Sequence, residues 1–216
     1  MEKPVLYDYW RSSASYRVRI ALNLLGIAYD AVAIDLLAKA HIAEEHRARN
    51  PQGLVPALAI HGQMLTQSLA IIEYLDETRS GAGLLAADPL GRARVRTLSY
   101  AIAMEIHPVC NLSVISDVMQ RTGGGDAVRS DWMQTYIRKG LVAFEALLGD
   151  GKSGLFCHGD TPTMADFCLV PQVYNAKRWG AELSDLPLLN AICDHCAGVE
   201  AFAAAHPDQV GPPPAN

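Results

Sequence analysis

The sequence has little of several features that would assign it to a special class of protein. Its 216 residues contain no apolar run of about 18 residues, the length that a membrane-spanning helix needs. Its 18 lysine and arginine residues do not exceed its 23 aspartate and glutamate residues, so it lacks the basic excess typical of nucleic-acid binding. The residues after Met1 do not have the charged-then-apolar pattern of a secretory signal. These absences predict a cytoplasmic protein without a membrane or nucleic-acid partner.

Cysteine is also scarce. The chain has five cysteines, an odd number scattered through its second half, which fits a reducing compartment better than a disulfide framework. Cys193 and Cys196 form a Cys-x-x-Cys motif, and such a pair can be redox-active or half of a zinc site. No second motif of this kind is present, and the pair lies in alanine-rich helical sequence. We therefore interpret it as two packed thiols and expect no metal site.

The first part of the chain has the pattern of a βαβ unit, in a sequence whose 50% apolar content can supply a large core. Pro4 to Tyr9 predicts a strand, the segment from Ser15 to Gly26 predicts a helix with a glycine at its end, and Tyr29 to Ile34 predicts a second strand. A helix between two strands of one sheet forms a right-handed crossover, so we expect these strands to be parallel.

The next segment adds a helix, a hairpin and a further helix. His41 to Arg49 predicts a short polar helix, and Asn50 to Gly53 has the composition of a turn. Leu54 to Ile60 and Gln63 to Leu65 predict the two strands of a hairpin, and Ser68 is placed to cap the helix that follows. The order βαβ, helix, ββα is that of a thioredoxin-like domain.

After residue 78 the pattern becomes helical. A linker ends at Asp88-Pro89, which has the pattern of a helix start. Helices are expected from Leu90 to about Met119, with a kink at Pro108, and from Ser130 to Leu148. Thr163 to Asp166 resembles a capping box that opens another helix.

We therefore expect a chain in four parts. Residues 1–79 form an α/β thioredoxin-like domain, and residues 80–88 form the linker. Residues 89–208 form an all-α substrate domain, and residues 209–216 form a disordered tail.

Four segments carry a resemblance to a known family. The segment Tyr9–Leu22 contains Arg-Ser-Ser-Ala-Ser-Tyr-Arg-Val-Arg, and it resembles the zeta-class signature of glutathione transferases, in which Ser-Ser-Cys-Ser precedes an aromatic residue and Arg-x-Arg. The segments Asn50–Pro56, Gln67–Leu75 and Met164–Val173 resemble the same family. The resemblance covers nearly the whole chain and implies the glutathione transferase fold, in which residues 1–79 are the glutathione-binding domain. Ala14 replaces the usual cysteine, so we expect no role for a second thiol.

The resemblance implies a glutathione-dependent cis–trans isomerase with a small dicarboxylate substrate. We expect its substrate to be maleylacetoacetate, a compound of tyrosine and phenylalanine breakdown, with maleylpyruvate, the substrate of close bacterial relatives, as the first alternative. The resemblance also implies a homodimer. Conjugation or dehalogenation of small α-halo acids and non-catalytic glutathione binding are the alternatives. A thiol–disulfide oxidoreductase is disfavoured, because it would need a cysteine at the position of Ala14.

The serine-rich turn at the start of the first helix is the predicted catalytic centre. Addition of a thiolate makes a conjugated cis double bond single and lets it rotate, and hydroxyls at a helix N-terminus favour the thiolate over the thiol. The resemblance implies that Ser12 is the thiolate partner and that Ser13 is the next candidate. The alternative is that these serines only cap the helix.

The other predicted contacts also come from turns and helix starts. The resemblance implies a cis bond between Val55 and Pro56, and it implies substrate binding by Arg11 and Arg178. Arg17 and Arg19 could also bind the substrate, but we consider it at least as good an interpretation that they lie on a solvated helix surface. The residues expected to bind glutathione are Ser12, Ser13, Ala14, Ser15, His41, Val55, Gln67, Ser68, His107, Asn111 and Ser113.

Overall fold

The structure, a computed structural model, describes residues 2–212. These residues divide into two units, of which the first contains residues 2–85 and 197–212 and the second contains residues 86–196. The helical domain is predicted to extend over residues 89–208, whereas in the structure residues 197–208 pack with the first part of the chain. None of the helices within residues 2–212 is both long and apolar enough to cross a membrane.

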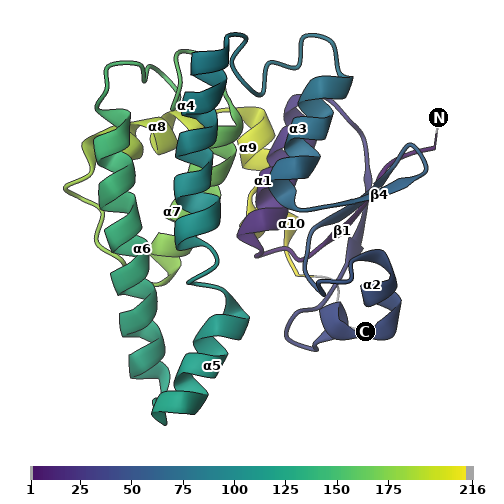
Figure 1. The fold of residues 1–216 in the computed structure, drawn as a ribbon, viewed down its shortest axis with the longest axis vertical. Coiled ribbons are helices and arrows are strands. Elements are labelled where there is room, and N and C mark those ends of the chain that lie inside the picture. Colours follow the sequence, from purple (N-terminus) through teal and green to yellow (C-terminus); the bar gives the residue numbers. More distant parts are fainter. Residues whose placement is uncertain (1, 213–216) are drawn as a thin grey trace. The chain divides into compact units, whose positions relative to one another are not determined.

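The first unit contains a four-stranded mixed sheet in the order β2-β1-β3-β4 (Figure 1). Its strands are β1 (Val5–Asp8), β2 (Asp30–Ala33), β3 (Ala57–Ile60) and β4 (Gln63–Thr66). β1 is parallel to β2, and β3 is antiparallel to both β1 and β4. The register places Leu6 of β1 between Ala31 and Leu58. The predicted βαβ unit and hairpin are both confirmed.

Two helices of this unit pack against each other, α1 and α3 (Figure 1). The helices within residues 2–85 are α1 (Ser13–Leu24), the 3-10 helix η1 (Ala40–Ile42), α2 (Glu44–Arg49) and α3 (Ser68–Thr78). All residues from Ser15 to Leu22 of α1 are buried. The prediction that Ser68 caps α3 is wrong, because the N-cap is Gln67 and Ser68 is already helical.

Two short helices near the end of the described chain belong to the first unit. They are α9 (Glu200–Ala205), which packs beside α1 (Figure 1), and α10 (Pro207–Val210). The predicted disordered tail is therefore wrong for residues 209 and 210. The ring of His206 stabilises the first turn of α10, because its Nδ1 accepts a backbone hydrogen bond there at 3.2 Å. Residues 213–216 of the predicted tail lie outside the described residues.

Two arginines of α1 are buried, so the interpretation of a solvated surface is wrong for both. Arg17 and Arg19 are 2% and 1% exposed. Arg19 Nη1 donates to both carboxylate oxygens of Asp8 at 2.8 Å, Nη2 donates to the Trp10 carbonyl at 2.9 Å, and Nε donates to the Ala205 carbonyl at 3.1 Å. A guanidinium can be buried when its charge and its N–H groups are paired in this way.

The second unit is helical, and the predicted long helix from Leu90 to about Met119 is wrong. The helices between residues 86 and 197 are α4 (Pro89–Tyr100), the π-helix η2 (Ala101–Ile106), α5 (Leu112–Thr122), α6 (Asp126–Leu148), α7 (Met164–Arg178) and α8 (Pro187–Ala197). The chain turns at residues 107–110 before α5 begins. Pro108 lies in this turn, and a proline cannot donate the N–H that would continue the helix.

α7 begins with the predicted capping box of Thr163 and Asp166. The buried carboxylate of Asp166 accepts hydrogen bonds from the N–H of Thr163 at 2.8 Å and from the N–H of Cys157 at 2.7 Å. One side chain therefore caps the helix and holds the preceding loop.

Cys193 and Cys196 both lie on α8, and Cys196 is buried. Burial raises the pKa of the Cys193 thiol to about 12 and also raises the pKa of Cys196. Both thiols are therefore protonated at neutral pH, which supports their interpretation as packed thiols. Within residues 2–212, no three or more histidine, cysteine, aspartate or glutamate side chains gather into a group that could hold a metal ion.

Replacement of Asp166 by alanine should lower the free energy of unfolding by about 2–4 kcal/mol, because α7 loses its cap and buried N–H groups lose their acceptor. Urea denaturation followed by circular dichroism measures the change. Asp131→Ala, at an exposed position of α6, is the control and should change this free energy by less than about 0.5 kcal/mol. A loss below about 1 kcal/mol for Asp166→Ala would contradict the stabilising role of the box.

Candidate functional site

Ser12 lies in the turn between β1 and α1. Its Oγ caps α1 by accepting a hydrogen bond from the N–H of Ser15 at 3.2 Å, and its own N–H donates to the Tyr9 carbonyl at 2.8 Å. The bond from Ser15 uses a lone pair of Oγ and leaves the hydroxyl proton available. Ser12 can therefore cap the helix and also donate a hydrogen bond to an anion, so the two interpretations of this serine are compatible.

The first turn of α1 supplies further donors. Ser13 and Ala14 are partly exposed, and their N–H groups lie at the end of the helix, where backbone N–H groups have no intrahelical partner. This end of a helix also favours negative charge through its dipole. Ser15 differs, because its side chain is buried with an enclosed Oγ and its N–H already bonds to Ser12. The candidate anion site is therefore formed by Ser12, Ser13 and Ala14.

Arg11 adds a positive charge to the same turn. Its Nη2 donates to the Tyr9 hydroxyl at 3.3 Å, and its guanidinium carbon lies 4.6 Å from the centre of the Trp10 ring. A guanidinium over an aromatic face is held by cation–π attraction. Two aromatic side chains thus hold a partly exposed arginine next to Ser12.

The N-terminus of α3 is a second candidate anion site. Its N-cap, Gln67, has a φ of 67°, which is uncommon for a residue other than glycine and is often found at functional sites. Gln67 Nε2 donates to Gln52 Oε1 at 2.7 Å. The adjacent Ser68 is buried, and its Oγ accepts a hydrogen bond from Arg17 Nη1 at 3.2 Å. A buried cation therefore reinforces the positive end of this helix.

The peptide bond between Val55 and Pro56 is cis, as predicted. The backbone just before it is held through the Leu54 carbonyl, which accepts a hydrogen bond from Asn50 Nδ2 at 2.8 Å and lies 2.9 Å from His46 Nε2. Both side chains are buried. The main chain at Val55 is thus fixed by side chains that come from α2 and from the turn after it.

His41 lies in η1 and is partly buried. Its Nδ1 is enclosed and makes no hydrogen bond with any of residues 2–212. Burial lowers the pKa of His41, and the neighbouring side chains of His46 and Arg47 lower this pKa further. The ring is therefore neutral at neutral pH, and it can donate a hydrogen bond to a ligand but adds no charge.

The residues predicted in the second unit lie around the break between η2 and α5. His107 directly follows η2 and is partly exposed. Asn111 is the N-cap of α5, and its Oδ1 accepts hydrogen bonds from the N–H and the Oγ of Ser113, each at 3.1 Å. Capping therefore explains Asn111 and Ser113, and their contact with a ligand stays a prediction.

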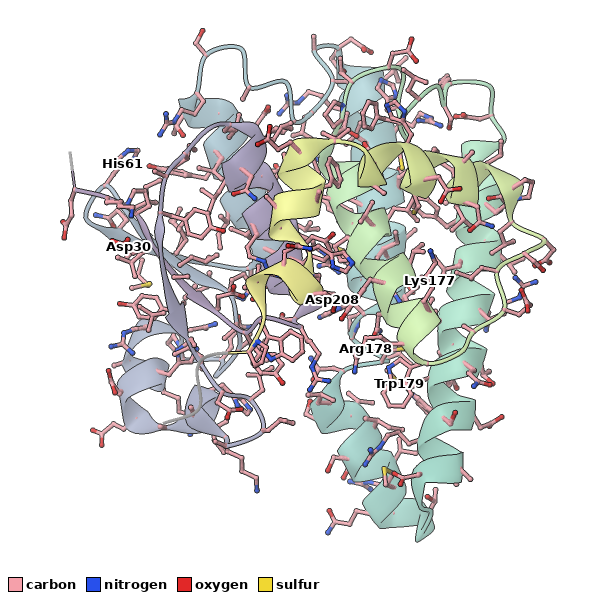
Figure 2. The ribbon with its side chains drawn as sticks, turned by 180° about the vertical axis from the view of Figure 1, so that it is seen from behind. Asp30, His61, Lys177, Arg178, Trp179 and Asp208 are labelled. Atoms are coloured by element: carbon pink, nitrogen blue, oxygen red, sulfur yellow. The ribbon has the colours of Figure 1, made fainter. Side chains whose placement is uncertain are left out.

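Arg178 is the last residue of α7 and is exposed. Figure 2 shows its side chain at this end of the helix with those of Lys177 and Trp179. Its Nη1 lies 3.5 Å from Asn175 Oδ1, and its guanidinium carbon lies 6.0 Å from the centre of the Tyr174 ring. The helix dipole favours a positive charge at this C-terminal end of α7. The planar guanidinium can donate two parallel hydrogen bonds to a carboxylate.

The first unit contains no thiol among residues 2–85, because the five cysteines of the chain lie between Cys110 and Cys196. Burial raises the pKa of Cys110 to about 11, so this cysteine is protonated at neutral pH as well. A thiolate at the N-terminus of α1 would therefore have to come from a bound molecule.

Arg17 and Gln52 belong to the α3 site but are not among the residues predicted from the sequence. The burial of α1 does have a signal in the sequence, because the apolar residues Val18, Ala21 and Leu22 follow the spacing i, i+3, i+4 of one helical face, but this pattern does not include the arginines of the helix. For Gln52 there is no local signal, since its partner Gln67 is distant along the chain.

The chain matches one family in both of its units. Residues 3–77 match the N-terminal domain of glutathione S-transferases, and residues 116–195 match the C-terminal domain. The maleylacetoacetate isomerase of Rhizobium meliloti (strain 1021) is 66% identical over 208 residues, which cover 96% of this chain and 98% of that protein.

Two solved structures extend the similarity to the fold. The holo structure of a zeta-class bacterial maleylpyruvate isomerase is 43% identical with a TM-score of 0.92 and covers 95% of this chain and 97% of its own. The maleylacetoacetate isomerase of Anaeromyxobacter dehalogenans 2CP-1, with bound dicarboxyethyl glutathione and citrate, is 40% identical with a TM-score of 0.86 and covers 99% of this chain and 100% of its own. The chain therefore belongs to the zeta class of glutathione transferases, the family of the maleylacetoacetate and maleylpyruvate isomerases.

Proposed function

We propose that this chain is a glutathione-dependent cis–trans isomerase that acts on maleylacetoacetate. The observation that carries the proposal is the N-terminus of α1, where Ser12 and Ser13 offer hydroxyls to an anion and no cysteine lies among residues 2–85. Such a site stabilises the thiolate of a ligand without a protein nucleophile. The 66% identity to the Rhizobium meliloti maleylacetoacetate isomerase supports the choice of substrate.

The polar groups of the first unit fit glutathione. The N-terminus of α1 would hold its sulfur, and the N-terminus of α3, with Ser68 beside the buried Arg17, would hold its γ-glutamyl carboxylate. The main chain of Val55 would pair with its cysteinyl part. When bound, glutathione supplies a thiolate that adds reversibly to the cis double bond of the substrate, so that this bond can rotate.

Ser12 is proposed to stabilise the thiolate by donating its hydroxyl proton. A thiol pKa of about 8.5 must fall by about two units to give mostly thiolate at neutral pH, and this shift needs about 2.7 kcal/mol. A hydrogen bond to a charged group contributes about 1.5–3 kcal/mol, and a helix N-terminus contributes about 0.3–1 kcal/mol. One hydroxyl and the dipole of α1 are therefore sufficient, and Ser13 is a second donor.

Arg11 and Arg178 are the proposed ligands of the substrate carboxylates. The aromatic side chains of Tyr9 and Trp10 hold Arg11 in place, which lowers the entropy cost of binding. Arg178 offers an exposed guanidinium. The Anaeromyxobacter dehalogenans relative binds dicarboxyethyl glutathione and citrate, and this supports a site for a compound with several carboxylates.

Maleylpyruvate is the second candidate substrate, because the holo structure of a maleylpyruvate isomerase matches this chain with a TM-score of 0.92. The chemistry is the same for both substrates. The remaining glutathione contacts also stay predictions, namely those of Ala14, Ser15, His41, Gln67, His107, Asn111 and Ser113.

The proposed enzyme is a cytoplasmic homodimer. The five free cysteines support a reducing compartment. Large apolar side chains on the surface of the second unit, such as Leu90 and Met104, support contact with another chain. Light scattering coupled to size-exclusion chromatography tests the proposed dimer.

Replacement of Ser12 by alanine should raise the pKa of bound glutathione by at least about one unit, because the thiolate loses a charge-assisted hydrogen bond. The ultraviolet absorbance of the thiolate, titrated against pH in the complex, measures this pKa. Ser80→Ala, at an exposed position outside the site, is the control and should leave the titration unchanged. An unchanged midpoint in Ser12→Ala would overturn the assignment of Ser12.

Replacement of Arg178 by methionine should raise the KM for the dicarboxylate about tenfold to a hundredfold, because a carboxylate loses its bidentate partner. Glutathione affinity, measured by calorimetry, should stay the same. Arg121→Met removes an exposed arginine from α5 and should leave both quantities unchanged. If Arg178→Met has the KM of the original enzyme, Arg178 does not bind substrate.

Turnover with glutathione should be faster for maleylacetoacetate than for maleylpyruvate, because the chain is 66% identical to an isomerase of the first compound. Steady-state kinetics with both compounds measure the preference. Chloride release from a small α-halo acid is the comparison assay for the displacement reaction. Absence of turnover with both maleyl compounds would refute the proposed isomerase.

A further inference from the structure

Arg19 holds the turn that carries Ser12 from inside the fold. It binds Asp8 at the end of β1 through both carboxylate oxygens at 2.8 Å, and it binds the carbonyl of Trp10 at 2.9 Å. These acceptors lie on either side of Tyr9, whose carbonyl accepts the N–H of Ser12. The backbone that leads into Ser12 is therefore fixed on both sides of its turn.

The side chain of Ser12 is fixed to the same helix as Arg19. Its Oγ accepts the hydrogen bond of the Ser15 N–H at 3.2 Å. Ser15 precedes Arg19 by four residues, so the two lie on one face of α1 about one turn apart. A shift of the turn relative to α1 would break the cap, the bonds of Arg19, or both.

The third acceptor of Arg19 comes from a distant part of the chain. The carbonyl of Ala205, the last residue of α9, accepts a hydrogen bond from Nε at 3.1 Å. Carbonyls at the end of a helix have no intrahelical partner, so Arg19 caps α9. Two further hydrogen bonds join α1 to α9, from the Tyr16 hydroxyl to the Phe202 carbonyl and from Asn23 Nδ2 to the Ala201 carbonyl, each at 3.3 Å. Of these three connections, that of Arg19 also reaches the turn before Ser12.

Arginine is suited to this position by its shape as well as its charge. Asp8, Trp10 and Ala205 offer acceptors in different directions, and the planar guanidinium carries donors for all of them. A lysine would keep the charge but concentrate its donors on one atom. Since Arg19 is 1% exposed, water cannot replace a lost bond without rearrangement of the fold.

We propose that Arg19 is a positioning residue that fixes the Ser12 hydroxyl for the ligand thiolate and makes this geometry depend on the docking of α9. The role rests on the proposed function, because it concerns the same thiolate site. Arg19 itself is too deeply buried to contact the ligand.

The first test is the thiolate titration of bound glutathione in Arg19→Lys. Misplacement of the Ser12 hydroxyl should raise the pKa of the bound thiol by about one unit, which lowers the thiolate fraction and kcat about threefold at neutral pH and about tenfold at a pH well below the original pKa. Glutathione affinity should change less than about threefold, because most contacts with the tripeptide are kept. Asp8→Asn keeps the shape of the pair and should shift the titration in the same direction, which provides a milder variant if Arg19→Lys does not fold.

Two control variants separate positioning from loss of stability. Tyr16→Phe removes one of the other hydrogen bonds between α1 and α9 but keeps that of Asn23, the ring beside Arg19 and all acceptors of Arg19. Leu141→Ala leaves a cavity in the buried core of α6, in the second unit. Both variants should lose thermal stability and keep the thiol titration of the original enzyme.

Hydrogen exchange of the Ser15 amide tests the same geometry without glutathione. This amide is protected by Ser12 Oγ, so its exchange should be about tenfold or more faster in Arg19→Lys and unchanged relative to its neighbours in Tyr16→Phe.

An unchanged Ser15 exchange rate in both Arg19→Lys and Asp8→Asn would overturn the proposal, and so would an equal shift of the titration in Tyr16→Phe or Leu141→Ala. If the original enzyme fails to lower the thiol pKa, the proposed function fails instead, and the exchange rates still decide the role of Arg19.

Discussion

The buried ion pair of Arg19 and Asp8 connects the parts of the first unit that carry its chemistry. Two charges removed from water are costly unless their attraction and hydrogen bonds are complete, and here the guanidinium also meets the carbonyls of Trp10 and Ala205. The end of β1, the turn before α1 and the end of α9 must therefore be in place together. The proposed positioning of Ser12 rests on this arrangement together with the cap that its own side chain forms.

α1 organises both candidate anion sites. Its N-terminus carries Ser12, and its Arg17 reaches Ser68 at the N-terminus of α3. Helix ends and hydroxyls provide hydrogen-bond donors that do not change their protonation at neutral pH. A site of this kind can stabilise a ligand thiolate without titrating itself, and this explains why alanine at position 14 is compatible with the chemistry.

The parts of the fold that follow local patterns could be predicted from the sequence. The βαβ unit, the hairpin, the capping box at Thr163 and the serine cap of α1 all have short-range signals in residue type and spacing. The burial of Arg17 and Arg19 could not be predicted in this way, because it depends on acceptors such as Asp8 and Ala205 that tertiary structure brings close. For the same reason the sequence predicts only a kink at Pro108 and not the break that the structure has, since packing decides whether a helix continues beyond a proline.

The return of α9 to the first unit has a consequence for biosynthesis. Residues 86–196 separate the two parts of this unit along the chain, so all of the second unit is translated before α9 emerges from the ribosome. Until then, the Arg19 guanidinium has Asp8 and the Trp10 carbonyl but lacks Ala205. The full set of Arg19 hydrogen bonds, and with it the proposed fixing of the Ser12 turn, can therefore form only after residue 205 has been synthesised.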